Sequence, residues 1–198
     1  MNIVVATCKN RGIGIKNQLP WRLLTDTCFF KYLTIGNEKN AVIMGKNTYL
    51  SLPKPLKHRD NIVLSTKMKA QKYNVFSTTS MGHVIHHLFK YDNVYLIGGE
   101  KVYNDYINND QVKGIYHTRI DGEYECDTYF PEIPEKYKKI KTTNFVDIEK
   151  KTGKKVKFDI DVYCNTEFNG DANSENLIKE SDIAIKKMGI YYDIFPCK

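Results

Sequence analysis

"VYLIGGEKVY", residues 94–103, is the stretch that decides the fold of this chain. An apolar run typical of a buried strand leads into Gly98 and Gly99, and a helical pattern begins near Glu100. Glycines at such a junction let a ligand approach the backbone closely, and free N–H groups at the start of a helix attract phosphate. A tight turn between a strand and a helix, with no ligand, explains the same residues. The stretch therefore predicts a strand followed by a helix, joined either by a phosphate site or by a simple turn.

Similar short apolar runs, rich in Val and Ile, recur along the chain. Because they do not alternate with polar residues and are bounded by turn residues, they suit strands buried on both faces of a mainly parallel sheet. The runs are "NIVVATC" (2–8), "AVIMG" (41–45), "NIVLS" (61–65), "YNVFS" (73–77), "NVYLIGG" (93–99) and "VKGIYHTRI" (112–120). Helical patterns lie between them, over 24–35, 46–51, 80–89 and 99–107. This order predicts an α/β domain.

The pattern changes after residue 136. "YKKIKTTNFVDIE" (137–149) and "KVKFDIDVYC" (155–164) alternate apolar and polar residues, which predicts an antiparallel hairpin that turns at Gly153. Residues 165–176 are polar and rich in turn formers, so we expect a linker there. Residues 177–195 show an imperfect amphipathic helix, which could dock on the body of the protein or on a partner.

Length and composition favour one main globular domain. A chain of 198 residues can bury one proper core but not two comfortable ones. No apolar run approaches the roughly 18 residues of a membrane helix. The opening residues lack the basic segment of a signal peptide, so the cytoplasm is the expected compartment. We therefore expect one domain over residues 1–164 and an extension of unknown role over residues 165–198.

The cysteines and histidines indicate neither a disulfide framework nor a metal site. The cysteines are odd in number, widely scattered and free of any C-x-x-C pair, so they are interpreted as reduced thiols. They are Cys8, Cys28, Cys126, Cys164 and Cys197. The five histidines show no spacing typical of metal ligands with a supporting carboxylate. We expect no bound metal.

The net charge of +7 suggests an anionic partner, which could be nucleic acid, a membrane surface or a phosphorylated small molecule. Residues 165–198 hold six acids and four bases, net −2, so residues 1–164 carry +7 − (−2) = +9. The bases of this body are dispersed rather than clustered, and no nucleic-acid-binding motif is present, which disfavours nucleic acid.

Two further strand ends carry residues suited to phosphate. After the run over 41–45, Gly45 is followed by Lys46, Asn47 and Thr48, which offer a cation, an amide and a hydroxyl. The run over 61–65 ends in "LSTK", which is Leu64, Ser65, Thr66 and Lys67. Ligands of α/β sheets usually bind at the carboxyl ends of the strands. A solvated lysine explains each position singly, whereas together they predict a site for a multiply phosphorylated ligand.

A carboxylate among apolar residues poses a separate question. "LPWRLLTDTCFF" (19–30) places Asp26 among Leu, Trp and Phe side chains. A buried carboxylate is costly unless it is paired, hydrogen-bonded or protonated. Asp26 is either a solvated residue on a helix surface or an acid held in a pocket for chemistry.

Taken together, these stretches resemble dihydrofolate reductase over nearly all of residues 1–164. The matching pieces are "GIGIKNQLPW" (12–21), Asp26, Phe30, "VIMGKNTY" (42–49), "PLKHRDNIVLS" (55–65), "IGGEKVY" (97–103), "TRID" (118–121) and "CDTYFPEI" (126–133). The resemblance implies a dihydrofolate reductase-like α/β fold, in which a central eight-stranded, mostly parallel sheet with an antiparallel C-terminal hairpin strand is flanked by four helices. It also implies NADPH-dependent reduction of 7,8-dihydrofolate to 5,6,7,8-tetrahydrofolate for one-carbon metabolism and nucleotide biosynthesis.

The resemblance assigns roles at the substrate. Asp26 would hold N3 and the 2-amino group of the pterin, Thr118 would bond that acid, and Trp21 would position a nearby water. Arg59 would clamp the α-carboxylate of the folate tail, a task that suits its planar donors. The substrate residues implied are Val4, Val5, Ala6, Asp26, Phe30, Leu52, Arg59, Ile97 and Thr118.

The resemblance also implies a cofactor site. Gly98 and Gly99, whose peptide bond is cis in the family, would line NADPH beside Tyr103. The residues implied are Ala6, Ile13, Gly14, Gly45, Lys46, Asn47, Thr48, Leu64, Ser65, Thr66, Lys67, Ile97, Gly98, Gly99, Glu100, Lys101, Val102 and Tyr103. Hydride would pass to C6 and a water would deliver the proton to N5. Antifolates such as methotrexate are the expected inhibitors.

One alternative activity and one possible partner stay open at this stage. A pterin- or flavin-precursor reductase of the same fold would explain the glycine pair, although not Pro20, Trp21 and Asp26 together. The extension over residues 165–198 could contact a partner, such as a fused or associated thymidylate synthase.

Overall fold

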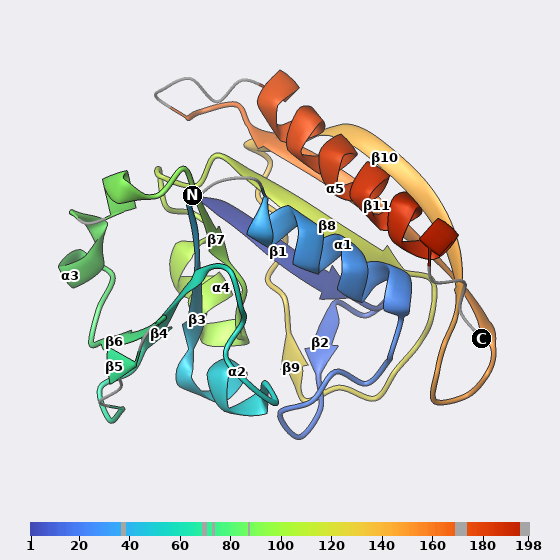
Figure 1. Cartoon of the computed structure of the whole chain (residues 1–198), viewed down its shortest axis with the longest axis horizontal. Helices are drawn as coiled ribbons and strands as arrows, with labels where there is room; N and C mark the ends of the chain where they lie inside the picture. The colour runs from blue at the N-terminus through green and yellow to red at the C-terminus, as the bar shows by residue number, and fades with distance from the viewer. Residues whose placement is uncertain (37–38, 69–70, 73, 87, 169–173, 195–198) are drawn as a thin grey trace.

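The chain folds around a twisted, mostly parallel sheet with helices on both faces (Figure 1). A computed structural model describes residues 1–36, 39–68, 71–72, 74–86, 88–168 and 174–194. Over these ranges the strand order of the large sheet is β10-β11-β8-β1-β7-β3-β4-β6-β5.

The six apolar runs form the parallel part of this sheet. They are β1 (Asn2–Thr7), β3 (Asn40–Gly45), β4 (Asp60–Leu64), β6 (Val75–Thr78), β7 (Asn93–Leu96) and β8 (Gly114–Ile120). All six pair in parallel with one another, as predicted. The predicted burial on both faces is wrong for β6, which lies near the edge of the sheet and has only Val75 buried. Residue 73 of the predicted run over 73–77 lies outside the described residues. A two-residue strand, β5 (Gln71–Lys72), pairs antiparallel with β6 at the edge.

The predicted hairpin forms the other side of the sheet. β10 (Tyr137–Ile148) and β11 (Lys155–Asn165) pair antiparallel, and the turn between them includes Gly153 with a φ of 71°. β11 also pairs antiparallel with β8, so the last strand in the chain lies inside the sheet and β10 lies at its edge. Apart from β5, the large sheet of the described chain thus has the eight strands that the family resemblance implies.

Three of the four predicted helices have nearly the predicted bounds. These are α1 (Leu24–Ile35), α2 (Lys46–Ser51) and α4 (Glu100–Tyr106). The helix predicted over 80–89 is wrong as a continuous element, because α3 spans only Gly82–Ile85 and a 3₁₀ turn, η1, follows at Leu88–Lys90. None of the α3 residues is buried and its N-cap has no side-chain hydrogen bond, so little packing stabilises a longer helix. Residue 87 lies outside the described residues.

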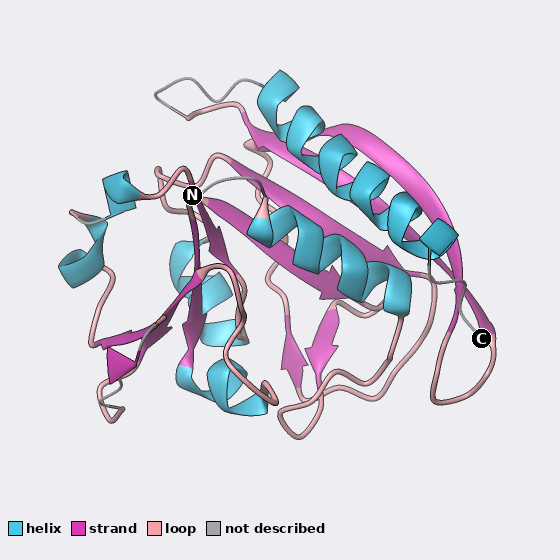
Figure 2. Cartoon of the chain, viewed as in Figure 1, coloured by secondary structure: helices cyan, strands magenta, loops and turns pink. Residues whose placement is uncertain are grey.

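The C-terminal helix α5 (Ser174–Ile194) docks on the body of the protein beside α1 (Figure 2). Leu177, Ser181, Ala184 and Met188 are buried, and their spacing places them on the one helix face that contacts the body. The hydroxyl of Tyr116 donates to Glu180 Oε2 over 2.7 Å. The helix begins three residues before its predicted start, and residues 169–173 of the predicted linker and residue 195 lie outside the described residues.

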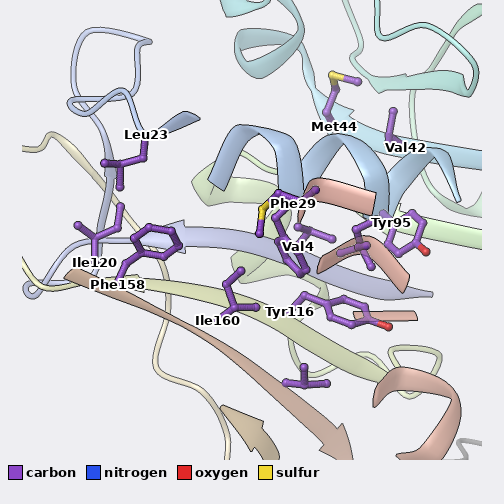
Figure 3. Packing of buried hydrophobic residues seen from close by; sticks show 14 of the residues in the cluster. Val4, Leu23, Phe29, Val42, Met44, Tyr95, Tyr116, Ile120, Phe158 and Ile160 are labelled. Atoms are coloured by element: carbon purple, nitrogen blue, oxygen red, sulfur yellow. The ribbon is translucent and has the colours of Figure 1, made fainter. Parts of the chain in front are cut away.

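Two hydrophobic cores lie on the two faces of the sheet. Figure 3 shows the first, in which Phe29 of α1 belongs to one buried cluster with Val4, Tyr95 and Tyr116. The second core, under α4, includes Ile3 and other side chains that point the opposite way. The division follows from strand geometry, because successive side chains of β1 point to opposite faces. None of the described helices is long and apolar enough to cross a membrane.

A small second sheet was not predicted from the sequence. β2 (Gly12–Gly14) pairs antiparallel with β9 (Thr128–Tyr129), and the N–H of Asp127 donates to the carbonyl of Gly14 over 2.9 Å. Strands of two or three residues carry no periodic pattern. These two are also far apart in the sequence, so only the folded chain brings them together.

Candidate active site

A large cavity opens at the carboxyl ends of β1, β3, β4 and β7. Its volume is about 1160 Å³, which exceeds the 300–1,000 Å³ typical of a pocket for one small ligand. Every residue that the sequence assigned to substrate or cofactor lines this cavity. Residues that are far apart in the sequence, from Val4 to Thr128, therefore meet in one place. Of the predicted set, only Trp21 is not in the wall.

Asp26, the third residue of α1, projects its carboxyl group into the cavity. Burial raises the pKa of this group to about 6, a hydrogen bond from the Thr118 hydroxyl opposes the rise, and the negative charge of Asp147 adds to it. Of the two readings of "LPWRLLTDTCFF", the structure supports an acid held in a pocket. No Lys or Arg forms an ion pair with Asp26 among the described residues.

Arg59 is a buried cation in the same cavity wall. Its side chain is 8% exposed, its Nε donates to the carbonyl of Lys57 over 3.1 Å, and its Nη1 contacts Thr34 Oγ1. Its guanidinium carbon lies 5.8 Å from the centre of the Phe30 ring. Burial lowers the pKa of Arg59 to about 10. Within the described part of the chain, no carboxylate pairs with this guanidinium.

Trp21 lies behind the cavity rather than in its wall. The side chain is 2% exposed, and its ring packs edge-on against Tyr124 with 5.3 Å between ring centres. Its Nε1 is buried without a hydrogen-bond partner from the described residues. Buried N–H groups are normally bonded, so this indole is available to a further acceptor.

The backbone of β1 is held to α4 at the cavity. The Tyr103 hydroxyl donates to the carbonyl of Val4 over 2.8 Å. A carbonyl oxygen has two lone pairs, so Val4 can still accept a bond from a ligand. Burial raises the pKa of Tyr103, and its hydroxyl therefore stays protonated in this bond.

Glycines open the part of the cavity between β3 and β7. The Gly98–Gly99 peptide bond is cis, as the family resemblance implies, and the N–H of Gly45 donates to the carbonyl of Gly98 over 2.7 Å. Gly98 has a φ of 108°, and a Cβ there would lie 3.1 Å from the Tyr103 hydroxyl oxygen. A side chain at residue 98 would be strained and would crowd this part of the wall.

The residues predicted for phosphate lie at the rim. Lys46 and Thr48 are half-buried, whereas Thr66 and Lys67 are exposed. Ser65 Oγ accepts bonds from the N–H groups of Lys67 and Met68 over 3.2 and 3.1 Å, which fixes the turn after β4. The rim thus places two lysines and three hydroxyls on one cavity.

The sequence interpretation did not assign the loop over residues 17–19 to the cavity wall. Residues 17–19 line the cavity, and Lys16 and Asn17 both have positive φ angles, 50° and 59°. The N–H of Lys16 donates to Asp127 Oδ2 over 2.8 Å, which ties the loop to the turn before β9. An Asn in a glycine-rich stretch was the available signal, because Asn tolerates the left-handed region. Other lining residues that the prediction omitted are Thr27, Phe29, Lys31, Ser51, Leu56, Thr79, Ser80, Asp105, Tyr106 and Thr128.

Comparison with known families agrees with this geometry. A family model described as "Dihydrofolate reductase" matches residues 1–164. This range includes all the parallel strands, the hairpin except for the last residue of β11, and every described residue of the cavity wall.

Individual relatives point the same way. A dihydrofolate reductase of Aedes albopictus is 36% identical over 169 residues, which is 77% of this chain and 91% of the relative. A viral dihydrofolate reductase of Saimiriine herpesvirus 2 is 38% identical over 178 residues, covering 82% of this chain and 84% of the relative. A bifunctional dihydrofolate reductase-thymidylate synthase of Arabidopsis thaliana is 36% identical over 147 residues, covering 66% and 26%. With its fold, its cavity and these matches in agreement, the chain belongs to the dihydrofolate reductase family.

Proposed function

We propose that the chain is a dihydrofolate reductase, which transfers a hydride from NADPH to C6 of 7,8-dihydrofolate and yields 5,6,7,8-tetrahydrofolate. The observation that carries this proposal is an acid and an arginine in one cavity, Asp26 and Arg59, neither with an ion-pair partner among the described residues. Unpaired charges facing one cavity call for a ligand that supplies their partners. Dihydrofolate has hydrogen-bond donors on its pterin for Asp26 and carboxylates on its tail for Arg59.

The same residues suggest how the substrate is oriented. Asp26 accepts bonds from N3 and the 2-amino group, while Ala6 and Phe30 form apolar walls for the rings. Arg59 already makes bonds through Nε and Nη1, which fix its plane, so the remaining donors are free to bind the α-carboxylate. This orientation brings C6 of the pterin toward the glycine-lined part of the cavity.

Proton delivery to N5 is assigned to a water rather than to a side chain. With a pKa of about 6, Asp26 is mainly ionised at neutral pH and favours a protonated pterin electrostatically. The buried, unpartnered Nε1 of Trp21 is a donor that can hold this water. Positioning and charge complementarity, not direct proton transfer from Asp26, are the protein's main contributions in this scheme.

The cofactor residues fit a nicotinamide dinucleotide. The cavity is large enough for two ligands, and glycines 45, 98 and 99 leave its wall open to a flat ring. Lys46, Thr48, Ser65, Thr66 and Lys67 would bind the phosphates at the rim. When bound, NADPH supplies the hydride.

We assign the reductase domain to residues 1–164 and treat residues 165–198 as an extension. The buried face of α5 supports a role in covering the body, and a fused or associated thymidylate synthase remains the alternative partner for the outer face. We place the enzyme in the cytoplasm, with methotrexate-type antifolates as competing ligands.

The decisive assay is the loss of NADPH absorbance when 7,8-dihydrofolate is added to the purified chain. We expect turnover that methotrexate abolishes, and no turnover when an oxidised flavin precursor replaces dihydrofolate. NADPH oxidation with the flavin precursor but not with dihydrofolate would overturn the proposal in favour of the alternative reductase. Retention on nucleic acid at physiological salt, without dihydrofolate turnover, would overturn it in favour of a binding protein.

A further inference from the structure

Helix α1, which carries Asp26, begins without an N-cap of its own. Leu23 occupies the N-cap position and offers no side-chain hydrogen bond. The first N–H groups of a helix have no partner within the helix, and a cap from Ser, Thr, Asp or Asn usually satisfies one of them. In this chain the N–H of Thr25 instead donates to Asp147 Oδ2 over 2.9 Å. Asp147, near the end of β10 and 122 residues away in the sequence, therefore caps the N-terminus of α1.

The turn of the β10–β11 hairpin holds the segment before α1 at several further points. Glu149 is 1% exposed, and its Oε1 accepts a bond from the N–H of Arg22 over 2.9 Å. The N–H of Lys150 donates to the carbonyl of Arg22 over 3.0 Å. Lys151 Nζ donates to the carbonyls of Leu19 and Pro20 over 2.9 and 3.0 Å. Asp147 is thus one contact of a clamp, residues 147–151, that fixes residues 19–25.

We propose that Asp147 is a positioning residue for the acid of the cavity: by capping the first turn of α1 it fixes the direction in which Asp26 faces the substrate. The inference rests on the proposed function for the identity of the substrate, whereas the contact between Asp147 and α1 is independent of it. Asp26 lies one residue after the capped amide of Thr25, so the cap and the acid share one helical turn. With the amide of Thr25 satisfied by Asp147, the carboxyl group of Asp26 is left to Thr118 and to the ligand.

The charge of Asp147 has a second effect on the same acid. A helix N-terminus favours a nearby anion, and Asp147 offsets this by placing a like charge beside Asp26. Thr118 on β8 is the other polar group that acts on Asp26, and it has the opposite effect on the pKa. The remaining charged groups of the clamp and of the segment that it holds are Arg22, Glu149, Lys150 and Lys151.

Two substitutions separate the cap from the charge. Asp147→Asn keeps a side-chain oxygen that can accept from Thr25 but removes the charge, whereas Asp147→Ala removes both. We expect Asp147→Asn to lower the pKa of Asp26, seen both in the pH profile of kcat and by carbon NMR of the unliganded protein, with KM for dihydrofolate unchanged. Asp147→Ala is expected to raise KM about fivefold in addition, the equivalent of losing one helix cap.

Glu149→Gln is the matched control, because it removes a charge from the same clamp but from a residue that does not cap α1. We expect it to leave the pKa of Asp26 unchanged. An unchanged KM in Asp147→Ala would overturn the positioning role of the cap. An Asp26 pKa that is unchanged in Asp147→Asn, or shifted equally by Glu149→Gln, would overturn the effect of the charge. The NMR titration needs no turnover, so it tests Asp147 even if dihydrofolate proves not to be the substrate.

Discussion

Asp26 and Asp161 are two carboxylates on opposite faces of one sheet, and their surroundings differ in one respect. Each accepts a hydrogen bond from a threonine on a neighbouring strand: Asp26 from Thr118, and Asp161 from Thr142 over 2.5 Å. Asp161, which is 0% exposed, also has two cations, Arg119 Nε at 3.3 Å and Lys139 Nζ at 3.6 Å. Asp26 has no ion-pair partner in the described chain and faces a cavity. Asp161 is buried and Asp26 is partly buried, and both are withdrawn from bulk water. The missing cation therefore distinguishes the site for a ligand from the site that the protein completes itself.

The largest expected effect is on turnover at Asp26. Asp26→Asn keeps the shape of the side chain but cannot carry a negative charge. We expect kcat/KM for dihydrofolate at pH 7.5 to fall on the order of 100-fold or more, and the loss to shrink toward pH 5, where the substrate arrives protonated and the wild-type acid is itself neutral. Steady-state rates across this pH range measure the effect. Near-normal turnover at pH 7.5 would remove Asp26 from the mechanism.

The second effect concerns stability at Asp161. Asp161→Asn removes the carboxylate that pairs with Lys139 and one of the two that pair with Arg119, which keeps Asp159 over 2.6 Å. Since both cations are half-exposed, we expect unfolding to become easier by about 2 kcal/mol rather than the roughly 3–5 kcal/mol of a fully buried pair. The midpoint of urea denaturation measures this loss. Asp182→Asn, which breaks the surface pair with Lys141, is the control and should change stability by less than about 0.5 kcal/mol. If Asp161→Asn lowered kcat/KM for dihydrofolate while leaving the urea midpoint unchanged, the assignment of Asp161 to stability and Asp26 to turnover would be contradicted.

A third, smaller effect is on the free energy of unfolding, which is lowered by keeping Asp26 ionised in the folded protein. The pKa of Asp26 is raised from 3.8 to about 6 in the folded protein, so the folded state binds more protons between these values and loses stability as pH rises through 6. Asp26→Asn removes this cost, and we expect it to be about 1 kcal/mol more stable than wild type at pH 8 and no more stable at pH 4. Paired urea titrations at the two pH values test it.

Comparing the two variants at each pH isolates Asp26 from the other titrating groups. The pKa of buried His117 is lowered to about 4, which costs stability as pH falls from 6.5 toward 4, but both proteins contain this residue and the contribution cancels. A stability difference that is the same at pH 4 and pH 8 would contradict a raised pKa at Asp26.

The smallest expected effect is on the pKa of Asp26, and it is tested with the two threonines that bond the carboxylates. Thr118→Val removes the bond that lowers the pKa of Asp26, so we expect this pKa to rise above about 6 in an NMR titration. Thr142→Val removes the matching bond at Asp161 and should leave the titration of Asp26 where it is. If Thr142→Val moved the Asp26 titration as much as Thr118→Val, the two carboxylates would not be independent sites.

Local patterns were enough to predict the parallel strands, and they gave the bounds of α1 and α2 at 24–35 and 46–51. These elements are fixed by the order of apolar and turn residues, which a single sequence displays. Part of the cavity wall was also predictable, because strand ends with glycine, lysine and hydroxyl residues gather at the carboxyl edge of a parallel sheet. The resemblance to the family then joined Asp26 to Thr118.

Contacts between distant parts of the chain could not be predicted in this way. The pairing of β2 with β9, the cap from Asp147 and the ion pairs of Asp161 each join residues whose proximity only the folded sheet determines. Asp147 and Asp161 look alike in the sequence, as acids in alternating strands. The docking of α5 stayed open for the same reason, since an amphipathic helix shows that one face is covered but not what covers it.

The place of β11 inside the sheet, between β8 and β10, has a consequence for synthesis on the ribosome. A chain that has emerged only as far as β10 leaves the edge of β8 unpaired, and open strand edges invite pairing with other chains. Until β11 has emerged and filled this gap, β10 cannot bring Asp147 to α1, because β10 joins the sheet only through β11. Asp26 therefore acquires its full environment only after β11 has left the ribosome and joined the sheet.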